Sequence, residues 1–429
     1  MPETGYGLEH NPTAAVEQSI VQRRRRLSFK PMNPDNYFSR TALIDATQRV
    51  LGYRLSWQDA QSGAARPDRT TQPMLALMAQ FPRQAGSSLF FIEIQAAALS
   101  SNSLEHLNPA TTVLMFSQAE LACPEGIGLA MSLHAQGFRL ALCHPDVALF
   151  DSSDGLLSLM AFVTADLANP DLAQIVRLAA LAEPALKLIV NKVSDWNAFD
   201  ACAALGLAGF FGNMCASPRS LPRIAEMGSQ TVLILQLMKM VQACADIREL
   251  EKVLQRDAML SYKLLRYINS AGFGLQIEIE SLRHAITMLG YLPLYRWLAL
   301  LLATTSTAGS SQALLQAAIV RGRFVELLGV GLLPASEAGN LFVVGLFSLL
   351  DQLLGIPMPQ LMRQVSLPDT IVHALLHREN IYGPLLALAE ACEGESGSAP
   401  ALADALFMTA SQVNKAHGSA IVWAQDINL

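Results

Sequence analysis

Apolar residues in the first half of the chain gather in short runs that are separated by longer mixed stretches. Runs of this length are typical of buried parallel strands, and the intervals are long enough for crossover helices. The runs are VLGYRLSW (50–57), SLFFIEI (88–94), TVLMFS (112–117), FRLALC (138–143), AFVTADL (161–167), ALKLIV (185–190) and GFFGN (209–213). We therefore predict an α/β first half, built as a barrel or as an open sheet.

After about residue 226 the pattern changes to the period of amphipathic helices. Asp246 and Glu249 have the spacing of a capping box at the start of one helix. A third helix is bounded by a cap at each end, Ser281 and Gly290. Between the first and third helices lies a second one, whose apolar stripe is formed by Leu260, Leu264, Leu265 and Ile268. The second half is therefore predicted to be all-α.

The segment at residues 216–230 holds two prolines and few large apolar residues, as expected of a joint between domains. We predict a flexible tail over residues 1–32, an α/β domain over 33–220 and a helical domain over 221–429. The run Arg23–Arg26 is interpreted as part of the disordered tail, with contact to a membrane surface or nucleic acid as the alternative.

Composition favours extensive burial. The chain is 52% hydrophobic and 15% charged, below the usual share of about 25% charged residues. The low charge content leaves room for an additional buried interface, either between the domains or between two copies in a homo-oligomer. A net charge of −6 argues against general nucleic-acid binding, which needs a cationic surface.

The six cysteines show no C-x-x-C spacing, which favours free thiols in a reducing compartment over disulfides or a zinc site. The basic run near the N-terminus is not followed by the apolar core of a signal peptide. No apolar stretch reaches the ~20 residues needed to span a bilayer. We expect a cytoplasmic protein without a membrane span.

The helical half resembles the HDOD domain, a helical relative of metal-dependent HD phosphohydrolases that lacks their catalytic residues. The resemblance is carried by RDAMLSYKLLRYINSAGFG followed by SLRHAITMLG, and it extends through GLFSLLDQLLGIPM (345–358) and LPDTIVHALLHREN (367–380). Where HD enzymes would present His-Asp to their metals, this chain has Ser348 and Leu349. Asp351 is expected to be a hydrogen-bonding partner in the core.

The first half resembles an eroded EAL domain, a barrel that hydrolyses cyclic di-GMP with two metal ions. YFSRTALIDATQRVLGYRLSW (37–57) looks like the opening of EAL-HDOD two-domain proteins, in which the strand after the Gly-Tyr pair begins with a metal-binding glutamate. Here that position holds Arg54, and a cation cannot ligate magnesium or calcium. Gln58 replaces the arginine that the resemblance implies for substrate phosphate.

The same resemblance places other residues at positions of the EAL chemistry. Asp166 and Lys192 are retained, and Gly212 is kept from the closing Q-G-Y motif. The remaining positions are changed to Glu93, Met115, Cys143, His144, Thr164, Asn191, Ser194 and Phe211. We therefore expect no catalytic site, no cofactor and no metal, and we expect Asp166 to cap the following helix.

Three further groups have both a structural and a functional interpretation. Cys143 and His144 are adjacent on a strand and point to opposite faces, so they are not expected to share a zinc ion. His373 and His377 have helical metal-pair spacing, but no third ligand can be named. The turn residues Asn269, Ser270 and Gly272 are candidates for a structural helix end or for partner binding.

The resemblance implies a bacterial signalling protein that is not an enzyme and that regulates other signalling proteins by binding them. The alternative is a receptor that binds cyclic di-GMP, or another nucleotide, in the degenerate EAL pocket.

Overall fold

The structure is a computed structural model of the chain. It describes residues 37–58, 71–79, 88–99, 104–105, 107–151, 155–169, 173, 176–177, 186–204, 207–212, 214, 228–269, 279–305, 311–334, 337–365, 367–394 and 397–425. The predicted tail, the run Arg23–Arg26, the turn residues Ser270 and Gly272 and most of segment 216–230 lie outside the described residues.

Eight strands close into a barrel in sequence order, which decides between the two α/β architectures that the apolar runs allowed. The first strand pairs antiparallel with its neighbours on both sides, and all other neighbours are parallel. The strands are β1 (Tyr37–Ile44), β2 (Val50–Gln58), β3 (Leu89–Glu93), β4 (Thr112–Ser117), β5 (Arg139–Cys143), β6 (Phe162–Asp166), β7 (Lys187–Asn191) and β8 (Gly209–Phe211).

Side chains fill the interior of the barrel, as the alternation of strand residues requires. The ring of Phe91 makes edge contacts with Phe162 and Phe211, at centroid distances of 5.2 and 5.1 Å. Met115, Cys143 and Ile189 belong to the same small internal core. Helices α2 (Thr71–Met78), α4 (Pro124–Ala135) and α6 (Trp196–Ala203) accompany the strands.

Helices make up the second half, as predicted, and its described residues include no strand apart from an isolated bridge between Val330 and Leu333. The expected caps are present: the side chains of Asp246 and Ser281 accept backbone hydrogen bonds from Arg248 and His284, and Gly290 ends its helix at φ 77°. The helices are α7 (Ser229–Gln242), α8 (Ile247–Leu254), α9 (Ala258–Ile268), α10 (Leu282–Leu289), α11 (Tyr291–Thr304), α12 (Gln312–Gly329), α13 (Ala338–Phe347), α14 (Leu350–Leu354), α15 (Met358–Gln364), α16 (Asp369–His377), α17 (Gly383–Glu393), α18 (Ala399–Ala405) and α19 (Ala410–Gln425).

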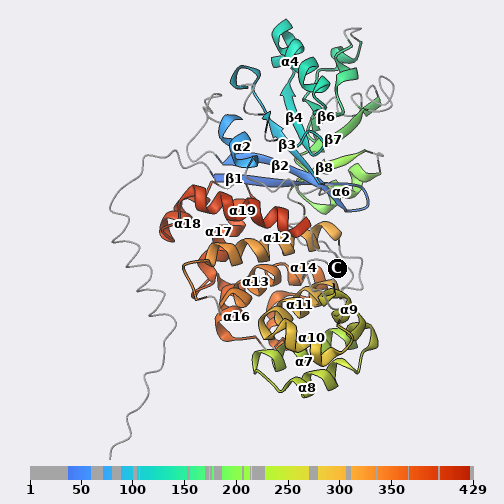
Figure 1. Cartoon of the computed structure of the whole chain (residues 1–429). Helices are drawn as coiled ribbons and strands as arrows, with labels where there is room; N and C mark the ends of the chain where they lie inside the picture. The colour runs from blue at the N-terminus through green and yellow to red at the C-terminus, as the bar shows by residue number, and fades with distance from the viewer. Residues whose placement is uncertain are drawn as a thin grey trace, which may run out of the picture.

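The two halves are stacked, with β1 and β2 lying along α12, α17 and α19 (Figure 1). At the contact, the ring of His417 lies parallel between Phe38 of β1 and Phe324 of α12, at centroid distances of 4.5 and 4.4 Å. The backbone N–H of Ala313 donates to the carbonyl of Gln48 in the β1–β2 turn. One apolar core therefore runs through both halves.

In the part of the chain that the structure describes, no single helix is long and apolar enough to cross a membrane; the bent pair α10–α11 meets the length and composition test only when its two helices are taken together.

Candidate functional site

Arg54 lies inside the barrel rather than at a solvent-facing strand end. Its side chain is half-buried, and its guanidinium carbon is 5.5 Å from the centroid of the Phe211 ring. A cation over an aromatic face is attracted by the electrons of the ring. The barrel therefore accommodates this cation against Phe211, where the EAL resemblance implies a metal-binding carboxylate.

Several positions along the central parallel strands are uncharged and buried. Met115, Cys143, Thr164 and Asn191 are all less than a tenth exposed. Burial raises the pKa of the Cys143 thiol to about 12, so the side chain stays protonated at neutral pH. Apolar and neutral groups therefore line the barrel at positions where the resemblance implies metal ligands.

Asp166 is the centre of a small charged group at the end of β6. Its carboxylate pairs with Lys192 Nζ at 2.6 Å and with His144 Nδ1 at 3.7 Å. Burial raises the pKa of Asp166, but the hydrogen bond from Lys192 and the nearby His144 outweigh it, so the pKa lies below its usual value. The retained carboxylate is therefore ionised and paired with the retained lysine.

Glu93 is exposed at the end of β3, and the hydroxyl of Ser194 donates to Asp195 at 3.1 Å. Over the described residues, His, Cys, Asp and Glu side chains form no group of three or more that could hold a metal ion. With Arg54 and Met115 at two of the implied ligand positions, the residues present do not fit the pair of metal ions that the EAL resemblance implies.

Gln58, which replaces the phosphate-binding arginine that the resemblance implies, lies at the contact between the two halves. Its amide nitrogen donates to the carbonyl oxygens of Ala391, at 2.7 Å, and Gly394, at 2.5 Å. Both carbonyls belong to the end of α17 or follow it directly. The structure therefore uses this side chain to join β2 to the helical half.

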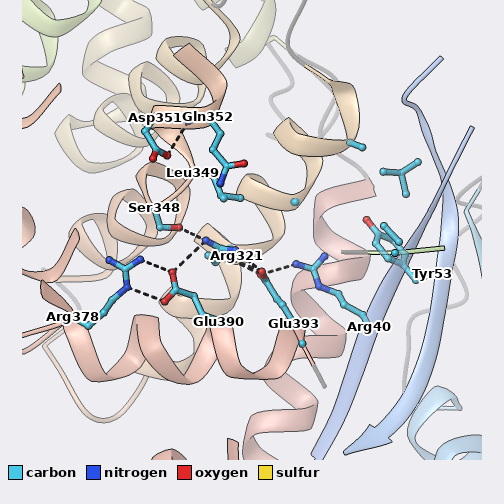
Figure 2. Close-up of a pocket in the computed structure, with 16 residues that line it drawn as sticks. Arg40, Tyr53, Arg321, Ser348, Leu349, Asp351, Gln352, Arg378, Glu390 and Glu393 are labelled. Atoms are coloured by element: carbon cyan, nitrogen blue, oxygen red, sulfur yellow. Dashed lines mark hydrogen bonds and ion pairs between the residues drawn. The ribbon is translucent and has the colours of Figure 1, made fainter. Parts of the chain in front are cut away.

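A cavity of about 400 Å³ lies between the halves and is lined in part by Ser348 and Leu349, where the resemblance implies the His-Asp pair of HD enzymes (Figure 2). The Ser348 hydroxyl accepts a hydrogen bond from Arg321 at 2.8 Å and donates one to the Gly345 carbonyl at 2.7 Å. The barrel side of the cavity is formed by Arg40, Ala42, Val50 and Tyr53 of β1 and β2, and by Gly212.

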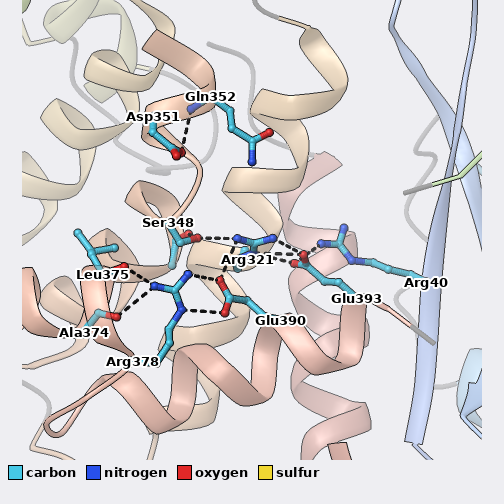
Figure 3. Close-up of polar contacts among 11 residues, drawn as sticks. Arg40, Arg321, Ser348, Asp351, Gln352, Ala374, Leu375, Arg378, Glu390 and Glu393 are labelled. Carbon is cyan, nitrogen blue, oxygen red and sulfur yellow. Dashed lines mark hydrogen bonds and ion pairs between the residues drawn. The ribbon is translucent and has the colours of Figure 1, made fainter. Parts of the chain in front are cut away.

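A network of arginines and glutamates, in which Arg40 and Arg321 are buried, links the two halves beside this cavity (Figure 3). Glu393 pairs with Arg321 at 2.6 Å and with Arg40 of the barrel at 2.9 Å. Burial raises the pKa of Glu393, but the two guanidinium groups outweigh it and hold the pKa at about 2. In the same network Glu390 forms two hydrogen bonds with Arg378, both 2.8 Å long.

Asp351 lines the cavity and is half-buried, whereas the sequence analysis expected a hydrogen-bonding partner within the core. Its carboxylate accepts a hydrogen bond from the backbone N–H of Gln352 at 2.9 Å. Burial raises the pKa of Asp351 above its usual value. Among the described residues, no cationic side chain lies within 4.0 Å of this carboxylate.

The remaining candidates are separate from both sites. Asn269 ends α9, and its side-chain amide bonds to the backbone N–H and carbonyl of Ile279, both at 2.9 Å. This bridge supports the structural interpretation of the turn. The ring centroids of His373 and His377 are 5.9 Å apart, and His373 Nδ1 lies 3.7 Å from Oε2 of the exposed Glu379.

Sequence reasoning missed the network of five charged residues beside the cavity, Arg40, Arg321, Arg378, Glu390 and Glu393. One signal was available: Arg321 lies among apolar residues in QALLQAAIVRGRFVELLG, on a helix that is buried along most of its length. A charged residue in such a position requires a partner, because burying an unpaired charge is very costly.

Comparison with known proteins identifies the helical half. Residues 227–354 match the HDOD domain family. The chain is 24% identical over 391 residues to "Cyclic di-GMP phosphodiesterase CdgJ" of Vibrio cholerae, covering 88% of this chain and 90% of the relative. It is 22% identical over 376 residues to "Uncharacterized protein YuxH" of Bacillus subtilis, covering 84% of this chain and 91% of that relative.

The chain also aligns with solved structures, several of which are named EAL proteins. Klebsiella pneumoniae BlrP1, in a manganese and cyclic di-GMP complex, aligns with a TM-score of 0.34 and 15% identity over 43% of this chain and 56% of that one. The Xanthomonas citri FimX EAL domain, in complex with cyclic di-GMP, aligns with a TM-score of 0.34 and 12% identity over 48% of this chain and 96% of that one.

The resemblance to EAL-HDOD proteins is confirmed by the HDOD match and by the alignment with CdgJ over 88% of the chain. The expectation that the chain is not an enzyme is wrong by the same comparison. The relative that matches most of the chain is named a phosphodiesterase, which points to enzyme activity. The error arose because individual barrel positions were weighed without the similarity of the whole chain.

Proposed function

Since this chain joins an eight-stranded barrel to an HDOD domain, we propose that it acts in cyclic di-GMP signalling by binding and regulating other proteins. The two halves, assigned to residues 33–220 and 221–429, act as one unit in this proposal. The observation that carries it is an exposed apolar face on the helical half.

That face lies on α9, where the side chains of Met259 and Tyr262 are 58% and 59% exposed. Lys263 and Arg266 are exposed on the same side of the helix, since residues spaced by three, four and seven lie on one face. Exposed aromatic, methionine and arginine side chains are enriched at protein–protein interfaces. The α9 face therefore suits a partner that offers apolar contacts and acidic groups.

The proposal is tested by affinity capture from the source bacterium with the full chain as bait. We expect at least one protein to be retained by the wild type and lost with the double variant Met259→Ser/Tyr262→Ser. Met131→Ser is the matched control, because Met131 is 56% exposed on α4 of the barrel. If every retained protein binds the α9 variant and the control equally well, the proposed surface is wrong.

A cyclic di-GMP phosphodiesterase is the second candidate function, and the name of the Vibrio cholerae relative favours it. Hydrolysis of cyclic di-GMP by the purified chain with magnesium or manganese, lost in Asp166→Ala, would support this candidate. Asp166 is the informative position because it is the ionised carboxylate that the resemblance places in the EAL chemistry.

A cyclic di-GMP receptor is the remaining alternative. The contact of Gln58 with the helical half removes this side chain from the barrel pocket that such a receptor would use. Calorimetric titration of the full chain with cyclic di-GMP, in the presence and absence of magnesium, separates binding from hydrolysis. Absence of heat in both titrations would eliminate the receptor.

A further inference from the structure

The cavity between the two halves has the volume of a small-molecule site. About 400 Å³ falls within the usual range for ligand pockets, roughly 300 to 1,000 Å³. Its apolar wall is made of short side chains, Ala42 and Val50 from the barrel and Ala313 and Ala317 from α12. These side chains leave space between the strands and the helix. A ligand of this cavity is therefore small and has an apolar part.

The arginines that line the cavity are already neutralised by glutamates. Arg40 and Arg321 share the Glu393 carboxylate, at 2.9 and 2.6 Å, and Arg378 pairs with Glu390 at 2.8 Å. An anionic ligand would have to displace one of these glutamates, and removing one partner of a buried ion pair is strongly unfavourable. The cavity is therefore a poor site for a phosphate or a carboxylate.

Asp351 is a carboxylate of the same lining that belongs to none of these ion pairs. Within the described part of the chain, no cationic side chain lies within 4.0 Å of it. Its Oδ1 accepts the backbone N–H of Gln352 at 2.9 Å. Its Oδ2 accepts no hydrogen bond from another described residue and is in contact with solvent. Figure 2 shows the carboxylate apart from the arginine–glutamate network, so a ligand in the cavity can reach it.

A half-buried carboxylate without a cationic partner favours a ligand that brings the cation. Burial raises the pKa of Asp351 above its usual value, and a positive charge beside the carboxylate offsets that cost. An ammonium group supplies this charge together with three hydrogen-bond donors. Hydrogen bonds between an ammonium and a carboxylate are about twice as strong as those between neutral groups.

We propose that the cavity binds a small organic cation, whose primary ammonium group is held by Asp351 and whose short apolar part packs against the alanines of α12. The ligand contacts both halves, because Asp351 belongs to the helical half while Ala42 and Val50 belong to the barrel. Its binding is therefore linked to the association of the halves. The inference depends neither on the α9 face nor on the interior of the barrel.

Calorimetric titration of the full chain with butylamine and with benzylamine tests the proposal. Butanol and benzyl alcohol are the matched neutral compounds, since each has the same apolar part. We expect each amine to bind at least about tenfold more tightly than its alcohol, because only the ammonium forms a charge-assisted hydrogen bond with Asp351.

The ammonium could belong to a free amine or to a lysine side chain of another protein, and Nα-acetyl-lysine amide separates these sources. Weaker binding of this compound than of butylamine would support a free amine as the ligand. Equal binding of the two would support the same site with a lysine side chain in it.

Two variants locate the site. Asp351→Asn is expected to weaken benzylamine binding at least about tenfold, because the amide is uncharged and has one acceptor oxygen in place of two. Ala317→Leu changes no charge and is expected to weaken benzylamine binding more than butylamine binding, because it takes up space beside the apolar wall. Asp369→Asn removes an exposed aspartate of α16 and is the matched control, with unchanged binding expected.

Equal affinity for an amine and its alcohol, no binding of either amine, or unchanged benzylamine binding in folded Asp351→Asn would each overturn the proposal. If Asp351→Asn does not fold, unchanged benzylamine binding in Ala317→Leu would overturn it instead. Amine binding that is retained in Met259→Ser/Tyr262→Ser would support this site even if the proposed partner surface proved wrong.

Discussion

Glu393 is the residue whose removal should separate the two halves most directly. It lies between Arg321 of α12 and Arg40 of β1, at 2.6 and 2.9 Å, so one carboxylate compensates two buried guanidinium groups. Replacing it by glutamine keeps the size of the side chain and removes the charge. Arg40 then loses its charged partner, Arg321 keeps only Glu390 at 3.5 Å, and breaking a buried ion pair costs roughly 3 to 5 kcal/mol.

The pKa of Glu393 gives a second measure of the same interaction. A fall from 4.5 to about 2 corresponds to about 3 kcal/mol of stability at neutral pH. This figure is an upper bound, because the side chain is 17% exposed and solvent screens part of the attraction. We therefore expect Glu393→Gln to lower the free energy of unfolding by about 2 to 4 kcal/mol at pH 7.

The pH dependence follows from the direction of this shift. A carboxylate with a depressed pKa stabilises the folded state fully above its unfolded value of about 4.5, and this contribution is lost as the pH falls toward 2. The difference between wild type and Glu393→Gln should therefore shrink as the pH is lowered through that window, since a protonated glutamate resembles glutamine.

Urea unfolding followed by far-UV circular dichroism at pH 7, 4 and 3 measures both effects. Glu379→Gln is the matched control, because Glu379 is 65% exposed and its change should stay within about 0.5 kcal/mol. If Glu393→Gln proved as stable as this control at pH 7, the assignment of a stabilising interdomain ion pair would be refuted.

Three other measurements probe packing and burial. Gly345→Ala should lower the free energy of unfolding by more than about 2 kcal/mol, because the added Cβ would lie 2.6 Å from the backbone oxygen of Arg321 in α12. Gly128→Ala places its Cβ in open space and should stabilise α4 by up to about 1 kcal/mol. Cys123 and Cys244 are exposed, so the folded double variant Cys123→Ser/Cys244→Ser should have two fewer thiols that react fast with an aromatic disulfide reagent than the wild type. An unchanged number of fast-reacting thiols would contradict this prediction. Burial holds the pKa of His417 well below 6.5, so this histidine takes up a proton in the unfolded chain but not in the folded chain as the pH falls from 7 to 5. The wild type should therefore lose stability over this range, and His417→Phe should lose less. Unfolding curves of both proteins at pH 7 and pH 5 measure the difference.

The strands of the barrel could largely be predicted from the sequence, because parallel strands covered on both faces are continuous apolar runs. TVLMFS coincides with β4, four other runs contain β3, β5, β6 and β8, and ALKLIV covers all of β7 except its last residue. β1 was not predicted as a strand. Its polar residues Ser39, Arg40 and Thr41 are buried, two of them with partners on β2 or α17 that no local pattern reveals.

The interdomain site could not be predicted for the same reason. Arg40 and Glu393 are separated by 353 positions in the chain, and their pairing exists only after the barrel has closed and the helices have packed against it. Resemblance located Ser348 and Leu349 as altered HD positions but gave no indication that a cavity adjoins them. The position of Gln58 was also predicted by resemblance, and the structure gives its side chain a contact that the barrel alone would not provide.

Strand β2 connects the two candidate sites physically. Adjacent residues on a strand point to opposite faces, so Arg54 enters the barrel beside Phe211 while Tyr53 lines the interdomain cavity. The last residue of β2, Gln58, donates hydrogen bonds to the carbonyls of Ala391 and Gly394, which lie within two residues of Glu393. A ligand that moves α17 relative to β2 must therefore also strain the strand that carries Arg54. A single strand therefore contacts both the interior of the barrel and the helical half.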